Sequence, residues 1–368
     1  MKVLLLADAA SSHVLKWANG LNRKGIEVFI FGLSDYTWKE YDENIQIKIV
    51  DFSTSVKKNK DGSFLKSVYL TSLPVLKKYI RTIKPDIIHS HSASSYGFLG
   101  ALLGFHPFFI SVWGSDIFIF PKKSIFHRMI LKFTLARADN IFSTGYTMKT
   151  ETEIYTSNNV DVVPFGVDTS VFKPALVESI FKVDDIVIGA VKSLDYNYGI
   201  EYLIDAFALL VEKYPALPLK LLLVGGGGMT NLLKDYAAKK GVSDKTVFTG
   251  LVPFSKVPFY QNMIDIAVFP SVSESFGVSV IEASACEIPV IVSNTGGLPE
   301  VVEDKLTGLI FPSKDVEKLF SKLELLIFNV ELREKMGKAG RERVMKHFNW
   351  DDSLEHMVNS YNQILRDY

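Results

Sequence analysis

The sequence predicts an α/β protein with two doubly wound parallel sheets, one in each half of the chain. The chain has 368 residues, of which 48% are hydrophobic, and at roughly 150 residues per domain this length predicts two or three domains. Short apolar runs alternate with stretches of helical period in both halves. The runs are apolar at every position, as in parallel strands that helices cover on both faces.

In the first half, each short apolar run is expected to form a strand, and the helical pattern at 14–23 follows the first of them. These predicted strands are 3–6, 28–32, 45–51, 86–89, 109–112 and 141–144.

The second half opens with a new strand after the stretch 164–174, which is rich in Pro, Gly and Asp and is expected to link the domains. Helical patterns at 200–214, 229–240 and 280–285 alternate with further strands. The predicted strands are 186–191, 219–224, 246–249, 266–269, 290–292 and 308–311. Ligands of open α/β sheets bind beyond the carboxyl ends of the strands, so the main site is expected in a cleft between two facing domains.

The net charge of the chain is zero, with 41 basic and 41 acidic residues, which disfavours a strongly basic nucleic-acid-binding protein. The halves nevertheless differ. Residues 1–165 carry 20 basic against 14 acidic residues, a net charge of +6, and the remainder carries −6. The basic excess is concentrated in 57–84 and 117–138, which indicates two surfaces with different partners.

The single cysteine, Cys286, has no partner for an internal disulfide, which fits a reducing compartment. The first residues lack the apolar core of a signal peptide, and no apolar run approaches the roughly 20 residues of a spanning helix. We therefore expect a cytoplasmic protein, and contact with the inner face of a membrane stays open.

The segment 270–293, PSVSESFGVSVIEASACEIPVIVS, places two carboxylates near the start of a helix. Glu274 precedes a Ser-Phe-Gly turn, and Glu282 lies about one turn into the helix. The backbone N–H groups of Phe276, Gly277 and Val278 stand at the helix N-terminus, which favours a phosphate. This combination suits a nucleotide sugar, although two solvated Glu side chains at a helix start would give the same pattern.

The segment resembles glycosyltransferase family 4, retaining enzymes of the GT-B fold whose signature is two Glu separated by seven residues. The resemblance spans nearly the whole chain. It also rests on VFTGLV (247–252), DIAVFPS (265–271), EIPVIVSNTGGLPEVVED (287–304) and TGLIFP (307–312). It implies an N-terminal acceptor-binding domain (1–165), a linker (166–184), a nucleotide-sugar-binding domain (185–348) and a final helix (349–368) that returns to the first domain.

The resemblance also implies roles for single residues on the donor side. Glu274 would contact donor-sugar hydroxyls near the reacting carbon, and Glu282 would hold the ribose. The amides of 276–278 would stabilise the departing diphosphate, whose negative charge grows in the transition state.

A cation usually assists these amides in the family, supplied by the loop that here reads GAVKSLDYNYG (189–199). Ser193 replaces the usual Arg and Tyr198 the usual Lys, so we expect Lys192 to bind the diphosphate. Ser193 and Leu251, which lies in VFTGLV, are counted as further donor-binding residues.

The run GGGG (225–228) follows a predicted strand but does not fit the Gly-x-Gly-x-x-Gly pattern of dinucleotide-binding enzymes, because Thr230 stands at the third position. A nicotinamide enzyme is therefore disfavoured. The glycines predict a tight turn in which Gly225 contacts the donor.

The first half is expected to supply the acceptor side. Ser11 and His13 follow the first strand, where small neighbouring residues leave room for a ligand. His89 and His91 lie two apart at a strand end and could share a face. With no third ligand nearby in sequence, substrate contact by His91 is favoured over a metal site.

The segment WGSD (113–116) resembles a family segment that usually reads His-Gly-x-Asp. Trp113 replaces the His and is counted as acceptor-binding. Asp116 either assists the acceptor hydroxyl as a base or orienter or caps a loop, and both alternatives stay open.

The basic segments have amphipathic character. Segment 121–137 places Ile125, Phe126 and Met129 at helical spacing among Lys and Arg residues, as in helices at anionic membrane surfaces. Packing of the same apolar stripe on the sheet is the alternative. Segment 57–84 adds aromatic residues among lysines, so both could form one docking face.

Together these features predict a metal-independent, cofactor-free hexosyltransferase that acts with retention. It would move a sugar from a nucleotide diphosphate to a glycan or lipid-linked acceptor in bacterial polysaccharide or lipopolysaccharide biosynthesis. One alternative is a synthase of the same fold with a soluble acceptor, such as a sugar phosphate. Another is a non-catalytic sugar-nucleotide-binding protein, which the changes at Trp113, Ser193 and Tyr198 would permit.

Overall fold

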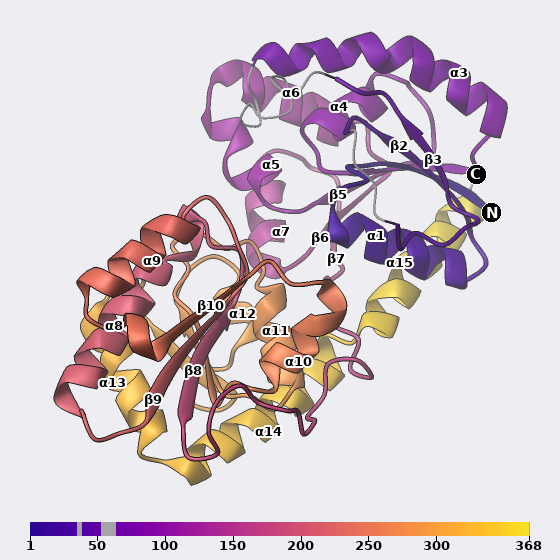
Figure 1. Cartoon of the computed structure of the whole chain (residues 1–368). Helices are drawn as coiled ribbons and strands as arrows, with labels where there is room; N and C mark the ends of the chain where they lie inside the picture. Colours follow the sequence, from indigo (N-terminus) through magenta and orange to yellow (C-terminus); the bar gives the residue numbers. More distant parts are fainter. Residues whose placement is uncertain (35–38, 53–63, 368) are drawn as a thin grey trace. The chain divides into compact units, whose positions relative to one another are not determined.

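The computed structural model describes residues 1–34, 39–52 and 64–367, which divide into two compact units (Figure 1). The first unit combines Met1–Phe165 with Asp352–Tyr368, and the second is Gly166–Asp351. Each is built around one parallel sheet with helices on both faces. The predicted α/β class with two doubly wound sheets is therefore confirmed.

The sheet of the first unit has seven parallel strands among the described residues, in the order β3-β2-β1-β4-β5-β6-β7. The strand β7, which the sequence analysis did not predict, has only three residues. The strands are β1 (Lys2–Leu6), β2 (Glu27–Gly32), β3 (Gln46–Ile49), β4 (Ile87–His91), β5 (Phe108–Val112), β6 (Asn140–Ser143) and β7 (Val160–Val162).

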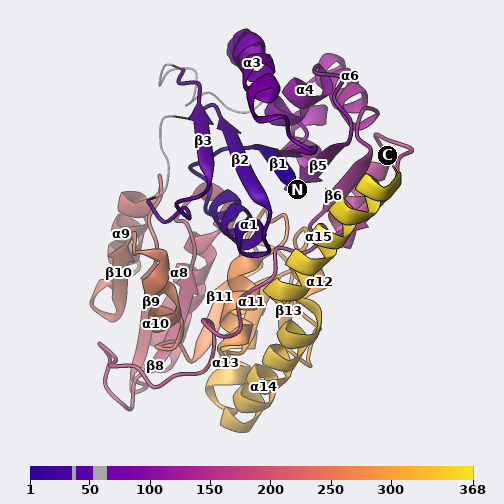
Figure 2. The ribbon, with the colours of Figure 1, turned by 90° about the vertical axis from the view of Figure 1, so that its right-hand side faces the viewer.

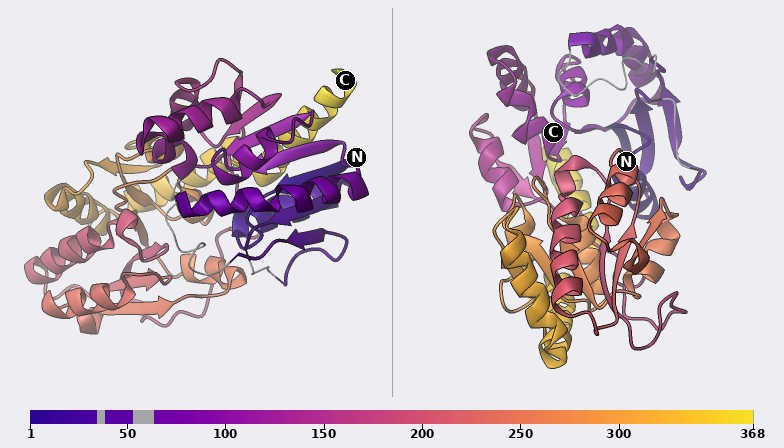
Figure 3. Two further views of the ribbon diagram at one scale, coloured as in Figure 1. Left: turned by 90° about the horizontal axis from the view of Figure 1, so that it is seen from above. Right: turned by 60° about the vertical axis from the view of Figure 1, so that its left-hand side comes forward.

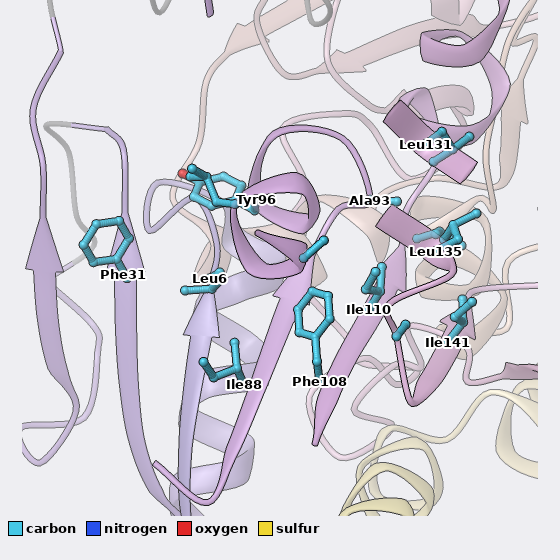
Figure 4. Packing of buried hydrophobic residues seen from close by; sticks show 14 of the residues in the cluster. Leu6, Phe31, Ile88, Ala93, Tyr96, Phe108, Ile110, Leu131, Leu135 and Ile141 are labelled. Atoms are coloured by element: carbon cyan, nitrogen blue, oxygen red, sulfur yellow. The ribbon is translucent and has the colours of Figure 1, made fainter. Parts of the chain in front are cut away.

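The helices of this unit lie on both faces of its sheet. On one face, α3, α4 and α6 cover a hydrophobic core that includes Phe31, Ile88 and Phe108 (Figures 2 and 4). The other face is covered by α1 and α15. The bounds are α1 (Ser12–Arg23), η1 (Phe64–Ser72), α3 (Leu73–Ile83), α4 (Ser95–Ala101), α5 (Ser115–Phe118), η2 (Phe120–Lys122), α6 (Ile125–Leu135), α7 (Tyr146–Glu153) and α15 (Trp350–Asp367).

The sheet of the second unit has six parallel strands across 166–351, in the order β10-β9-β8-β11-β12-β13. As in the first sheet, the order reverses beside the first strand of the unit, between β8 and β11. The strands are β8 (Ile186–Val191), β9 (Leu219–Val224), β10 (Thr246–Gly250), β11 (Ile266–Phe269), β12 (Val290–Ser293) and β13 (Gly308–Phe311).

Helices α8, α9 and α13 cover one face of this sheet, and α10, α11 and α14 cover the other (Figures 1 and 3). Their apolar stripes bury residues such as Phe207 and Leu323. The bounds are η3 (Tyr196–Tyr198), α8 (Ile200–Lys213), α9 (Thr230–Lys239), η4 (Ser243–Lys245), η5 (Phe254–Lys256), α10 (Val257–Gln261), α11 (Val278–Ala285), α12 (Leu298–Val301), α13 (Val316–Ile327) and α14 (Val330–His347).

The first half of 166–184, the segment expected to link the domains, packs on the second unit. Val167 bridges to Asn349, and Phe172 is 2% exposed. The side chain of Asn262 accepts a hydrogen bond from the Ala175 N–H and donates one to the Lys173 carbonyl oxygen. These contacts explain why the second unit begins at Gly166.

A buried hydrogen bond joins α15 to the sheet of the first unit. The hydroxyl of Tyr361, which is fully buried, lies 2.5 Å from Nδ1 of His89 on β4. The Tyr361 ring also packs edge-on against Phe109 on β5. Because a buried polar atom is costly without a partner, this contact makes α15 part of the first unit's core.

Replacing Tyr361 by Phe is expected to lower the free energy of unfolding of the first unit by about 1–3 kcal/mol, since it leaves His89 Nδ1 unpaired in the core. Denaturant unfolding of the full chain measures the change. Asn362→Ala, at the adjacent exposed position, is the control and should stay within about 0.5 kcal/mol of the unchanged protein. Equal stability of the Phe variant and the control would contradict the assigned bond.

Candidate functional site

In the second unit, the loops that follow β8, β9 and β11 are joined by backbone hydrogen bonds at the carboxyl edge of the sheet. The Leu194 N–H donates to the carbonyl oxygen of Gly226 at 3.0 Å, which links the first two loops. The carbonyl oxygen of Asn197 accepts from the N–H groups of Val272 and Ser273 at 2.8 and 3.2 Å, which links the first and third loops. These bonds hold the loop containing Lys192 against the loop containing Glu274.

The run Gly225–Gly228 connects β9 to α9, and its glycines have a steric reason. Gly225 has a φ of +133°, and a Cβ atom there would lie 2.1 Å from the Lys192 carbonyl oxygen. A Cβ atom on Gly227 would lie 2.5 Å from the carbonyl oxygen of Leu194. Only glycine lets these backbones approach so closely. The contact of Gly225 with a donor stays a prediction.

Lys192, expected to bind the diphosphate, and Glu274, expected to contact the donor sugar, form an ion pair. Lys192 Nζ lies 2.6 Å from Glu274 Oε2, and the two side chains are only 13% and 12% exposed. The ammonium also lies 4.4 Å from the centroid of the Tyr198 ring. Burial raises the pKa of the Tyr198 hydroxyl, and the nearby Lys192 opposes that rise. A cation and a carboxylate are therefore held together at this edge.

The backbone at Glu274 is fixed from a second side, by the loop after β12. Gly296 has a φ of +55°, and a Cβ atom there would lie 1.7 Å from the Glu274 carbonyl oxygen. The N–H of Gly297 donates to this oxygen at 3.3 Å. Side chains at positions 296 and 297 would displace this loop. The two glycines are therefore needed to hold the backbone of Glu274 in place.

The segment 276–278 begins α11, as predicted. Phe276 is 3% exposed, and its ring packs against Phe348. Gly277 has a φ of +108° and precedes the first helical residue, Val278. Within the part of the chain that the structure describes, the N–H groups of Gly277 and Val278 have no recorded acceptor. Glu282, on the same helix, is 7% exposed.

The remaining donor-side residues of the sequence analysis are exposed. Ser193 follows Lys192 and points to solvent, and Leu251, after β10, is 85% exposed. Their contact with a donor stays a prediction.

In the first unit, His89 and His91 lie on one face of β4, with ring centroids 4.7 Å apart. Both ring nitrogens of His89 have partners, the hydroxyls of Tyr361 and Ser111. His91 is 4% exposed, and its Nδ1 has no hydrogen-bond partner among the described residues. Burial, reinforced by the nearby His13, lowers the pKa of His91 to about 3. His91 is therefore neutral and has an unused polar atom.

Aromatic rings gather beside His91 at the carboxyl edge of this sheet. The Trp113 ring lies 4.6 Å from that of His91, and the His13 ring stacks on Phe165 at 4.3 Å. Trp113 and Phe165 meet edge-to-face at 5.3 Å. The structure thus brings His13, His91 and Trp113 together. The sequence analysis did not count Phe165 as a site residue. Its ring contacts with His13 and Trp113 join residues far apart in the sequence, so no local spacing indicates them.

Asp116 is buried and accepts hydrogen bonds from the backbone. Its carboxylate accepts from the N–H groups of Ala93 at 2.8 Å, Gly114 at 2.8 Å and Trp113 at 3.2 Å. Ala93 follows β4, and the other two follow β5, so this side chain joins the loops that carry His91 and Trp113. This geometry favours the loop-capping alternative for Asp116.

Ser11 is the residue before α1, but its side chain makes no capping hydrogen bond there. Its contact with an acceptor stays a prediction. A search of the described residues finds no group of three His, Cys, Asp or Glu side chains that could hold a metal ion.

The basic segment 121–137 forms η2 and α6, and it divides into two faces. Leu131 and Leu135 enter the core, whereas Ile125, Phe126 and Met129 are 59%, 64% and 60% exposed. The exposed apolar side chains lie among five exposed cations of the segment, of which Lys122 is paired with Glu151 at 2.9 Å. The five are Lys122, Lys123, Arg128, Lys132 and Arg137. The core thus buries only part of the apolar stripe of this segment. The remaining apolar side chains and the cations around them form an exposed surface. We call it the α6 surface.

Segment 57–84 differs from its expected role, although residues 57–63 lie outside the described residues. The rings of Tyr69 and Tyr79 belong to the core and its edge, where Tyr79 packs against Phe29 and Phe31. The lysines of α3, Lys77 and Lys78, are exposed. These aromatic residues therefore do not add to a docking face. No described helix is both long enough and apolar enough to span a bilayer.

Comparison with known proteins identifies the family. The model of the family "Glycosyl transferases group 1" matches residues 173–343, and that of "Glycosyl transferase 4-like" matches residues 2–145. An uncharacterised glycosyltransferase of Methanocaldococcus jannaschii is 28% identical over 355 residues, which cover 93% of this chain and 91% of the relative. One subunit of the phosphatidylinositol N-acetylglucosaminyltransferase of Arabidopsis thaliana is 27% identical, over 82% of this chain and 66% of the relative.

Solved structures share the fold over the whole chain. A sucrose-phosphate synthase of Thermosynechococcus elongatus superposes with a TM-score of 0.84 at 20% identity, covering 100% of both chains. The Anabaena protein HepE, solved in complex with UDP, superposes with a TM-score of 0.78 at 17% identity, over 99% of this chain and 100% of that one. HepE was also solved with UDP-glucose. The chain therefore belongs to the glycosyltransferase group 1 family of the glycosyltransferase 4 type, and it is a glycosyltransferase enzyme of the GT-B fold.

Proposed function

We propose that the protein moves a sugar, with retention of its anomeric configuration, from a nucleotide diphosphate to a glycan or lipid-linked acceptor. The observation that carries this proposal is the buried pair of Lys192 and Glu274. Glu274 lies shortly before the start of α11, where two N–H groups have no recorded acceptor among the described residues. The complexes of the structural neighbour HepE with UDP and UDP-glucose support a nucleotide sugar as donor.

On the donor side, the residues of the second unit provide what departure of a diphosphate requires. When the bond between the sugar and the phosphate oxygen breaks, negative charge accumulates on the diphosphate. N–H groups at a helix N-terminus and an ammonium group stabilise that charge more in the transition state than in the ground state. Glu274 would bind sugar hydroxyls, and Glu282 the ribose.

No metal takes part in the proposed reaction. The positive charge that a divalent ion would supply to the phosphates comes from Lys192 and the amides of Gly277 and Val278. An ammonium group and oriented backbone N–H groups are general alternatives to a metal for stabilising anions.

On the acceptor side, His91 and Trp113 are proposed to contact the sugar-accepting molecule, with Asp116 positioning their loops. Neutral His91 offers a hydrogen bond through Nδ1, which has no partner among the described residues. Trp113, His13 and Phe165 offer ring faces for the apolar side of an acceptor. His91 thus supplies polarity where Trp113 has replaced the family's usual His.

The α6 surface favours an acceptor that resides in a membrane. Its three exposed apolar side chains and its exposed Lys and Arg side chains match the requirements of an anionic bilayer surface, where each Lys or Arg near the surface contributes about 1 kcal/mol. The Arabidopsis relative is named after a lipid, phosphatidylinositol. A lipid-linked acceptor on the inner face of a bacterial membrane, in polysaccharide or lipopolysaccharide assembly, fits both observations.

Replacing Glu274 or Glu282 by Ala is expected to lower turnover of the nucleotide sugar by about 100-fold or more. The first change removes contacts with the donor sugar near the reacting bond, and the second removes the contact with the ribose that holds the donor in place. Release of nucleoside diphosphate, measured with the donor that most raises the melting temperature of the unchanged protein, follows the reaction. Glu317→Ala, an exposed change at the start of α13, is the control. Undiminished turnover in both Glu274→Ala and Glu282→Ala would refute the proposed donor site.

The protein is expected to cosediment with vesicles containing anionic phosphatidylglycerol and not with pure phosphatidylcholine vesicles, and rising salt should release it because the Debye length shortens. The double variant Phe126→Ser/Met129→Ser should lose most of this binding. Ile154→Ser, which removes another exposed apolar side chain of the first unit, should retain it. Absence of salt-sensitive binding would favour the synthase of the same fold that uses a soluble acceptor.

A further inference from the structure

The loop after β8 contains one basic residue, Lys192, and its position therefore decides whether positive charge reaches the diphosphate. Within the part of the chain that the structure describes, Lys192 is the one Lys or Arg recorded within ion-pair distance of Glu274. A lysine has a long stem with many rotamers, and holding it in one place costs entropy. Some feature of the site must restrict it.

Two contacts restrict the Lys192 ammonium. Glu274 Oε2 accepts a hydrogen bond at 2.6 Å, and the ring of Tyr198 lies 4.4 Å away. A cation near the face of an aromatic ring is attracted to its π-electrons, more strongly where water is excluded. An ammonium has three N–H donors. The bond to Glu274 uses one of them, which leaves two for phosphate oxygens.

Tyr198 is itself held in place. Its ring packs against the core of the second unit. The next residue, Gly199, has a φ of +60°, and a Cβ atom there would lie 2.3 Å from the Pro270 carbonyl oxygen. The preceding residue, Asn197, accepts the hydrogen bonds from Val272 and Ser273. The ring is thus fixed to the same loop that carries Glu274.

From this geometry we infer that Tyr198 is a positioning residue for the transfer reaction, whose ring face holds Lys192 where it can both neutralise Glu274 and bind the donor's diphosphate. The inference rests on the proposed function. According to this inference, the Tyr198 ring affects donor binding only by holding Lys192 in position. Glu274 without its cation would repel the diphosphate, so loss of the ring weakens diphosphate binding through two charges at once.

The test measures the dissociation constant of UDP by calorimetry in a set of variants of the full chain. Lys192→Ala and Tyr198→Leu are each expected to weaken binding about tenfold, within the range of desolvated cation–π contacts. Tyr198→Phe keeps the ring face and should bind within about twofold of the unchanged protein. Tyr196→Leu removes the other tyrosine of the same turn, which is 73% exposed, and should also stay within about twofold.

The double variant Lys192→Ala/Tyr198→Leu separates positioning from a general structural effect. If the ring acts through Lys192, the double variant binds no more weakly than Lys192→Ala alone. Additive losses, or a tenfold loss in Tyr198→Phe, would overturn the inference, the latter because it would assign the effect to the hydroxyl. Full binding by Tyr198→Leu with weak binding by Lys192→Ala would also overturn it, while leaving the proposed donor site intact.

The proposed function fails in a different way. If UDP, GDP and ADP all fail to bind the unchanged protein, the proposed donor class is wrong, and the inference fails with it. Melting temperatures of the unliganded variants, recorded in the same preparations, show that each variant is folded.

Discussion

Each sheet reverses its strand order beside the first strand of its unit, and the arrangement of chemical groups depends on this constraint. In the first unit the reversal lies between β1 and β4, and in the second between β8 and β11. The loops that leave two such strands turn to opposite faces of the sheet, so room remains for ligands between them. His91 ends β4, and Lys192 directly follows β8. Both residues owe their location to topology before any side-chain interaction is considered.

Close backbone packing then turns this location into a defined geometry. At the second edge, glycines at 225, 227 and 296 allow four loops to approach in pairs, within distances that a Cβ atom would forbid. At the first edge, the carboxylate of Asp116 joins two loops through their N–H groups. The two units thus fix the loops around their candidate residues by different means. The second unit uses glycines that allow close backbone contact, and the first uses the buried carboxylate of Asp116.

Much of the fold followed from apolar runs in the sequence, because strands buried on both faces must be apolar at every position. The three-residue strand β7 was missed, since so short a run carries no pattern. Glu274, Glu282 and the start of α11 were found from one motif. The ion pair of Lys192 with Glu274 was not predicted, because it joins residues 82 positions apart. For the same reason, the stacking of His13 on Phe165 and the packing of Tyr79 against Phe29 and Phe31 depend on contacts that no local spacing encodes.

The discontinuous first unit has a consequence for synthesis of the protein. Its core includes Tyr361, which the ribosome adds after all of 166–351, whereas the second unit is one continuous segment. The second unit can therefore complete its core first. Until Tyr361 is added, Nδ1 of His89 lacks its hydrogen-bond partner. During translation, β4 and the edge that carries His91 remain incompletely supported until α15 emerges. The first unit is begun before the second unit and completed after it.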